Sequence, residues 1–216
     1  MLDVYLALDG KITSNSLDVI GFRPKSIIFV GSSSTGTTVI STCRVLADMG
    51  LDLPENILLA FPSVSPNIAH VSPSRSLMAL DHMISTTVFL TMFDAYAPDN
   101  VTDYRANRTP WFKRNREYVR SRIKQIDQKS KSDPYFDPFI GSFEIFNKTK
   151  LILIACELDP VLDDSIELAK KWPLGLVDFE VMPNVVHGFF HGFETDDTRK
   201  ATQYTIEKLR NMVKLA

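Results

Sequence analysis

Four short runs of apolar residues constrain the fold of this chain more than any other feature of the sequence. The runs are Ser26–Val30, Asn56–Phe61, Leu151–Cys156 and Leu176–Met182. Continuous apolar runs, unlike alternating ones, are typical of parallel strands that helices cover on both faces. Apolar residues at helical spacing occur in Ser34–Met49, Leu162–Trp172 and Asp196–Leu215. We therefore predict an α/β fold, with a parallel sheet of about four strands and flanking helices.

Two stretches interrupt this alternation of strands and helices. Ser74–Tyr96 has a mostly helical pattern and is rich in Leu, Met and Phe. Asp99–Ser132 contains ten basic and four acidic residues, whereas the whole chain has a net charge of −2. We expect this basic segment to be an exposed excursion outside the sheet, with a helix near Trp111–Gln128. It is either a solvated helix and linker or a docking insert attracted to anionic surfaces.

Composition excludes several classes of protein. A net charge of −2 argues against a nucleic-acid binder, which usually carries a basic excess. No apolar run reaches the roughly 18 residues that a membrane span needs. Because no basic leader or cleavage site follows Met1, we expect a cytoplasmic protein. The two cysteines, Cys43 and Cys156, lie far apart in apolar elements, so we expect both to be buried reduced thiols. Together with four scattered histidines they show no metal-ligand spacing, and we expect no metal site or cofactor.

The segment from Ser26 to Cys43, SIIFVGSSSTGTTVISTC, predicts a strand, a glycine turn and a helix in succession. A nucleophile elbow, Gly-x-Ser-x-Gly, holds its serine on such a corner, beside a backbone N–H that can bind an oxyanion. Gly31 to Thr35 places Ser33 at the centre of this pattern, with Thr35 in place of the second glycine. A frame shifted by one residue gains Gly36 and loses Gly31. A phosphate loop, which would lack its lysine, and a purely structural turn are the alternatives.

The later sequence favours the elbow, because an acid and then a histidine follow in the order that such enzymes use. Asp159 comes directly after the third apolar run, and His187 follows the fourth. The carboxyl ends of parallel strands share one edge of a sheet, so we expect Ser33, Asp159 and His187 to meet there. Alternatively, Asp159 caps the next helix and His187 is an ordinary loop histidine.

Other acids and histidines compete with these candidates. Asp163 and Asp164 fit the first turn of a helix, where the macrodipole favours acids. His191 repeats the His-Gly-Phe pattern of His187, whereas His70 and His82 precede the strands that should carry the acid and the base. We expect His191 to point away from the serine turn.

Several motifs of the chain, from about residue 17 onward, resemble the hormone-sensitive lipases of the α/β-hydrolase superfamily. They are GSSSTG, GLDLPENILLAFP, SPSRSLMALD, DAYA, DPYFDPFIG, ACELDPVLDDS and the final HGF. The resemblance implies an α/β-hydrolase fold, with Ser33 as nucleophile, Asp159 as triad acid and His187 as triad base. The basic segment at about 99–132 lies where the animal lipases carry a regulatory insertion.

The sequence departs from the family pattern at two places. The family elbow reads Gly-Asp-Ser-Ala-Gly-Gly, whereas here Ser32 replaces the aspartate, Ser34 the alanine and Thr35 a glycine. We expect the β-branched Thr35 to strain the turn or to push the helix away from the strand. The family's His-Gly-Gly-Gly oxyanion motif belongs upstream of Met1. Residues 1–216 therefore correspond to the C-terminal half of a hydrolase domain, and the first strand should be an uncovered edge of the sheet.

The expected activity is hydrolysis of acylglycerols or other lipid esters by a serine carboxylester hydrolase. Ser33 would attack the ester, Asp159 and His187 would assist it, and the backbone N–H of Ser34 would bind the oxyanion. No cofactor is implied. The expected partners are the lipid ester and a lipid-droplet or membrane surface. The alternative is a non-catalytic pseudo-hydrolase, or a fragment inactive in isolation, that binds lipid or a partner protein.

Overall fold

The computed structural model describes residues 24–67, 71–81, 84–96, 116–191 and 194–215, together with Tyr5. At its centre lies a four-stranded parallel sheet. The strands are, in sheet order, β1 (Ile28–Ser32), β2 (Asn56–Ala60), β3 (Lys150–Leu158) and β4 (Val177–Val186). The predicted parallel sheet is confirmed. As expected, β1 forms an edge, because within the described residues it pairs with β2 alone.

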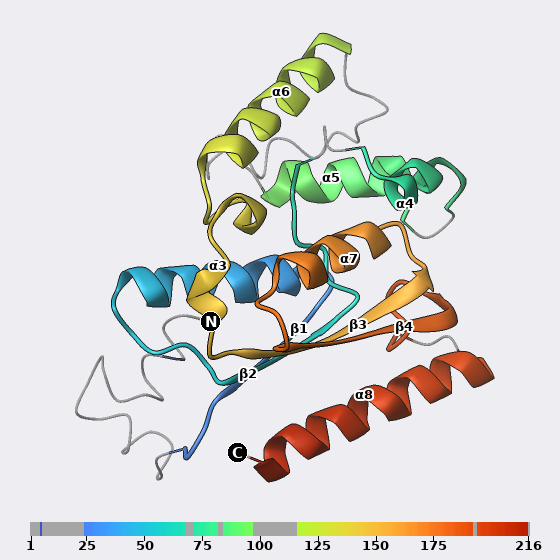
Figure 1. Cartoon of the computed structure of the whole chain (residues 1–216). Coiled ribbons are helices and arrows are strands. Elements are labelled where there is room, and N and C mark those ends of the chain that lie inside the picture. Colours follow the sequence, from blue (N-terminus) through green and yellow to red (C-terminus); the bar gives the residue numbers. More distant parts are fainter. Residues whose placement is uncertain are drawn as a thin grey trace, which may run out of the picture.

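Helices cover both faces of this sheet (Figure 1). The helices α3 (Thr35–Asp48) and α7 (Leu162–Lys171) lie on one face, and α8 (Asp196–Leu215) lies on the other. Ile57 and Leu59 of β2 pack into the core beside α3 and α7, whereas Leu58 and Ala60 pack into the core beside α8. Because both faces of β2 are buried, its sequence is continuously apolar.

The fourth strand differs from its predicted bounds. β4 continues to Val186, beyond the predicted end at Met182, and contains Pro183. A proline is tolerated there because β4 is an edge strand within the described residues. The N–H groups on the outer side of an edge strand do not donate to a neighbouring strand, so a residue without an N–H can stand there. The register between β3 and β4 shifts between Cys156 and Leu158. Both strands extend beyond the apolar runs that predicted them.

The stretch Ser74–Tyr96 consists of α4 (Pro73–Ser76), the 3₁₀ helix η1 (Leu77–Leu80) and α5 (Thr86–Tyr96). Asp81 separates η1 from α5, and its side chain accepts the N–H of Ile84. In Figure 1, α5 lies beyond α3 and α7, on the side away from the sheet. Two further 3₁₀ helices, η3 (Pro138–Ile140) and η4 (Glu144–Phe146), lead into β3.

The basic segment is described only from residue 116 onward, and residues 99–115 lie outside the described part. Its helix, α6 (Arg116–Ser132), ends four residues beyond the predicted Gln128 and lies on the far side of α5 from the sheet (Figure 1). Ile126 packs against Phe136, whereas Lys124 and Lys129 are exposed. A docking role for this segment stays a prediction. No helix within the described ranges is both long and apolar enough to cross a bilayer.

Both cysteines are buried free thiols, as the sequence predicts. Burial raises the pKa of Cys43 to about 12 and also raises the pKa of Cys156. At pH 8 the reactive thiolate of Cys43 is therefore only about 10⁻⁴ of the total. We expect neither thiol to react with Ellman's reagent in the native chain at pH 8, and both to react in guanidinium chloride. Titration of a thiol within minutes under native conditions would contradict this burial.

Candidate active site

The turn between β1 and α3 presents Ser33 in a conformation that serine rarely adopts. Its φ is 52°, in the left-handed region where an L side chain is strained. Three backbone hydrogen bonds hold this residue: its N–H donates to the Ala60 carbonyl at 3.2 Å, and its carbonyl accepts the N–H groups of Gly36 and Ser63, both at 2.9 Å. Since Ala60 is the last residue of β2, Ser33 lies at the carboxyl edge of the sheet.

Ser33, His187 and Asp159 lie in one hydrogen-bonded line. The Ser33 Oγ is 2.8 Å from the His187 Nε2, and the His187 Nδ1 is 2.8 Å from the Asp159 Oδ2. The three residues directly follow β1, β4 and β3, so the parallel sheet brings their side chains to one edge. His187 also packs edge-on against Phe61, with ring centroids 5.0 Å apart.

The carboxylate of Asp159 has a second hydrogen-bond partner. While Oδ2 faces His187, Oδ1 accepts the N–H of Val161 at 2.8 Å, just before α7. The side chain is only 1% exposed. Asp159 is not the N-cap of α7, because that position is Val161 and has no side-chain cap. One carboxylate oxygen of Asp159 holds the chain just before the helix, and the other faces the histidine.

The other predicted residues occupy separate positions. His191 is exposed, and the structure pairs His187 rather than His191 with Ser33. His70 and His82 lie outside the described residues. The Ser34 N–H has no hydrogen-bond partner within the described part of the chain. By contrast, the N–H groups of Gly36 and Thr37 donate to the carbonyls of Ser33 and Ser63. The role of Ser34 as an oxyanion donor stays a prediction.

The expected strain at Thr35 is wrong. Thr35 is the first residue of α3, its φ is not positive, and it lines a groove between β1 and α8 where a branched side chain fits. The tight position is one residue further on. A Cβ added to Gly36 would lie 2.4 Å from the Cβ of Pro62, closer than any real contact between such atoms. The glycine that the turn requires is therefore Gly36.

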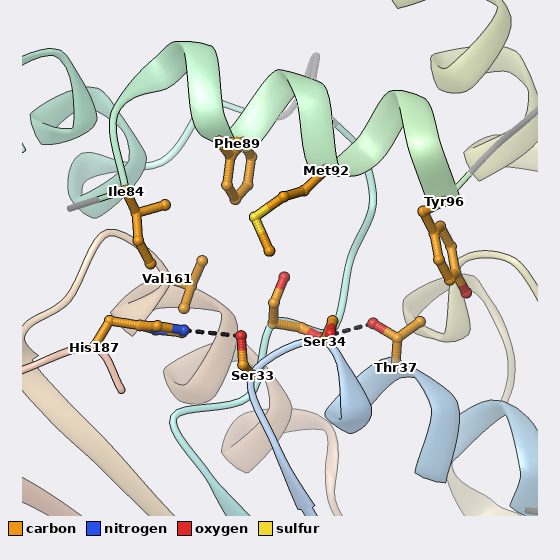
Figure 2. A pocket seen from close by; sticks show the side chains of 10 residues that line it. Ser33, Ser34, Thr37, Ile84, Phe89, Met92, Tyr96, Val161 and His187 are labelled. Atoms are coloured by element: carbon orange, nitrogen blue, oxygen red, sulfur yellow. Dashed lines mark hydrogen bonds between the residues drawn. The ribbon is translucent and has the colours of Figure 1, made fainter. Parts of the chain in front are cut away.

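A pocket opens above Ser33, and its walls are mostly apolar (Figure 2). Figure 2 shows Ile84, Phe89 and Met92 on one side of it and Val161 near His187. Its polar lining comes from the serine turn and its neighbours, Ser33, Ser34, Thr37, Ser63 and His187, and from Tyr96 at the end of α5. The arrangement places the hydrogen-bonded Ser33 hydroxyl and His187 imidazole at the base of a mostly apolar pocket. No group of three metal-binding side chains gathers anywhere in the described ranges.

Sequence reasoning missed the residue that binds Asp164. Asp164 lies in the first turn of α7, as predicted, but it is also buried in an ion pair with Arg75, at 2.8 Å. The side chains are 3% and 4% exposed, respectively. Only Asp163 is partly exposed, and its carboxylate accepts the Ser74 N–H at 2.7 Å. The signal available in the sequence was Arg75 itself, a cation two residues before the apolar Leu77–Leu80 segment.

No protein-family model and no curated protein matches this sequence. Solved structures do resemble the fold. Carboxyl esterase 2 from the mycorrhizal fungus Tuber melanosporum matches with a TM-score of 0.63 and 15% identity, over 96% of this chain and 56% of that one. An esterase from Pyrobaculum calidifontis matches with a TM-score of 0.61 and 16% identity, over 94% of this chain and 56% of that one. The chain has part of an α/β-hydrolase fold.

A further structural neighbour is an esterase from the bacterial hormone-sensitive lipase family. It matches with a TM-score of 0.60 and 16% identity, over 94% of this chain and 59% of the esterase. The chain thus spans little more than half the length of these α/β-hydrolases. The fold that the sequence resemblance implied is confirmed, and so is its extent of about half a hydrolase domain.

Proposed function

We propose that this α/β-hydrolase chain belongs to a serine carboxylester hydrolase. The observation that carries the proposal is the hydrogen-bonded line from the Ser33 Oγ through His187 to the buried Asp159. That the structural neighbours are esterases supports the same class of reaction.

In this proposal Ser33 is the nucleophile. Its hydroxyl oxygen attacks the ester carbonyl carbon while the His187 Nε2 accepts the hydroxyl proton. His187 then donates that proton to the departing alkoxide, which leaves an acyl group on Ser33. In the second half of the reaction water attacks this acyl group, His187 accepts the water proton and returns it to Ser33, and the carboxylic acid is released. Asp159 orients the imidazole and stabilises its charged form, and the Ser34 N–H donates to the oxyanion.

The lining of the pocket supports an ester with an apolar acyl group as the substrate. Phe89, Met92 and Val161 offer hydrocarbon surface beside Ser33, and no carboxylate, lysine or arginine lines the pocket within the described residues. We therefore propose acylglycerols or other lipid esters as the substrate class. The reaction requires no cofactor, because the proposed residues supply both the nucleophile and the proton transfer.

A fluorophosphonate probe tests this proposal, because only an activated serine attacks its phosphorus. After labelling, the modified peptide is identified by mass spectrometry. We expect the adduct on Ser33. An adduct on Ser34 would favour the shifted frame of the turn. A chain that is folded but takes no label would favour the non-catalytic pseudo-hydrolase instead.

The acyl preference provides a separate prediction at Met92. Each methylene buried in an apolar pocket contributes about 0.8 kcal/mol, so a butanoyl ester should exceed an acetyl ester by about 10-fold in kcat/KM. Met92→Lys places a charge on this wall and should remove most of that preference. The side chain is 48% exposed, so the fold tolerates the change. The measurement is hydrolysis of the two p-nitrophenyl esters.

Met49→Lys is the matched control for this experiment. Met49 is a methionine of similar exposure, 52%, but it lies after the far end of α3 and outside the pocket. It should keep the preference for butanoate. If both variants kept it, Met92 would not contact the acyl chain.

A further inference from the structure

Loop 61–67, which follows β2, contacts the candidate nucleophile and the candidate base. The Ser63 N–H donates to the Ser33 carbonyl at 2.9 Å. The Ser63 carbonyl in turn accepts from the N–H and the hydroxyl of Thr37, at 3.2 and 2.7 Å. At the start of the loop, the ring of Phe61 packs against His187. The position of this loop therefore sets the position of both side chains.

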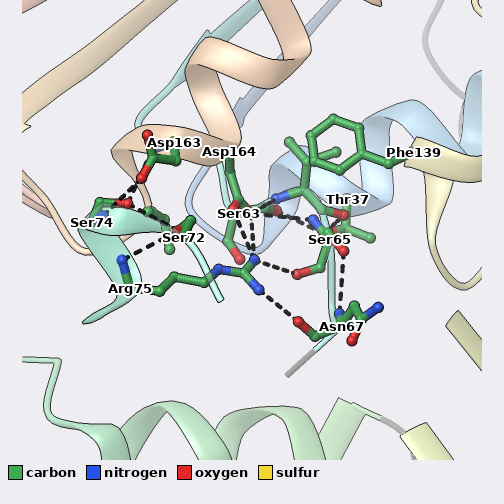
Figure 3. Close-up of polar contacts among 12 residues, drawn as sticks. Thr37, Ser63, Ser65, Asn67, Ser72, Ser74, Arg75, Phe139, Asp163 and Asp164 are labelled. Atoms are coloured by element: carbon green, nitrogen blue, oxygen red, sulfur yellow. Dashed lines mark hydrogen bonds and ion pairs between the residues drawn. The ribbon is translucent and has the colours of Figure 1, made fainter. Parts of the chain in front are cut away.

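Asp164 and Arg75 hold this loop from the opposite side (Figure 3). Asp164 accepts the N–H groups of Val64 and Ser65, at 3.0 and 3.2 Å. The Arg75 guanidinium donates to the carbonyls of Ser65 and Asn67, at 2.8 and 2.6 Å, and to both oxygens of Asp164. Backbone donors and acceptors of one short loop are thus fixed by one buried ion pair.

The same ion pair connects the loop to the segment that carries Asp159. Asp164 lies in the first turn of α7, five residues after Asp159. The Leu162 N–H donates to the Asp159 carbonyl at 3.0 Å, so the segment between the two acids is ordered. On its other side, Arg75 lies over the ring of Phe89, a wall of the pocket, at 5.3 Å from the ring centroid.

We infer that Arg75 and Asp164 are positioning residues that fix the serine turn, the histidine and the acid in one reactive arrangement. They touch none of the three side chains and act through loop 61–67 and the start of α7. Reacting groups must be held within about 1 Å, since a misplacement of that size costs about 10²-fold in rate. This inference rests on the proposed function, because it assigns a role in the same reaction.

The test compares two buried arginines. Arg75→Lys keeps the charge but loses the planar fork that spans two carbonyls and a carboxylate. Arg44→Lys is the matched control, because Arg44 is equally buried and donates to the carbonyls of Pro138 and Ser142, away from the serine turn. The readouts are the rate of fluorophosphonate labelling of Ser33 and the thermal unfolding midpoint of each variant. All rates are measured well below every midpoint.

We expect both variants to unfold at lower temperature, but only Arg75→Lys to label at least 10-fold more slowly. In ester hydrolysis the loss should appear in kcat, with KM changed less than twofold. Equal labelling rates in Arg75→Lys and the wild type overturn the inference, as does equal slowing in Arg44→Lys. Asp164→Asn, which preserves side-chain volume, serves as a second variant with the same expected loss. A folded wild type without label instead contradicts the proposed function.

Discussion

Replacing Ser33 by alanine should abolish fluorophosphonate labelling and reduce ester hydrolysis by on the order of 10³-fold or more. The change removes the oxygen that lies 2.8 Å from the His187 Nε2 and leaves the rest of the line intact. The loss should appear in kcat, because the apolar walls that bind the acyl group remain. Initial rates with p-nitrophenyl butanoate and gel detection of the probe measure both effects.

Ser32→Ala is the matched control for this loss. Ser32 is the neighbouring serine and the last residue of β1, but it lines the groove beside α8 rather than the pocket of Ser33. The Ser32→Ala variant should label and hydrolyse like the wild type. Undiminished hydrolysis by Ser33→Ala would assign the activity to another residue.

Gly36→Ala should cause the largest loss of stability among single substitutions in the turn. Its new Cβ would lie 2.4 Å from the Cβ of Pro62 and 3.2 Å from the Pro62 Cα, neither of which can move as a flexible side chain would. Overpacking of this kind costs about 3 kcal/mol. For a chain of this size the unfolding midpoint should fall by roughly 6–12 °C. Calorimetry or circular dichroism measures it.

Gly50→Ala separates this clash from the general cost of replacing a glycine. Gly50 has a φ of 69° and no atom within 4 Å of an added Cβ, so only backbone strain opposes the change. We expect a loss of about 1 kcal/mol there. If the two variants lost the same stability, the close approach of Gly36 to Pro62 would not limit the turn. Displacement of the turn should also slow Ser33 labelling in Gly36→Ala, but not in Gly50→Ala.

The central strands could be predicted from the sequence because burial on both faces leaves a direct mark on composition. β2 and β3 have apolar residues in nearly every position, and their predicted and observed bounds differ by few residues. β4 was harder, since its outer position allows exposed residues and even Pro183 within the strand. The pattern of a strand is therefore clearest where both of its faces are covered.

The candidate site could be predicted where local motifs coincide with strand ends. Ser33, Asp159 and His187 each follow an apolar run, and parallel topology alone brings such positions together. The Arg75–Asp164 pair could not be predicted in this way, because 89 residues separate its partners and no periodic pattern connects them. Thr35 was misjudged because the position of the close contact with Pro62 depends on how α3 meets loop 61–67.

The two hydrogen bonds of Asp159 determine which nitrogen of His187 carries the proton. Oδ1 is occupied by the N–H of Val161, so Oδ2 alone faces the imidazole and requires a donor there. The proton of the neutral ring is therefore held on Nδ1, and Nε2 presents a lone pair toward Ser33. An asparagine that kept its carbonyl on Val161 would turn its NH₂ toward Nδ1 and favour the opposite tautomer. The Asp159 carboxylate thus selects the basic tautomer of the imidazole before any ester is bound, and the start of α7 fixes which of its oxygens does so.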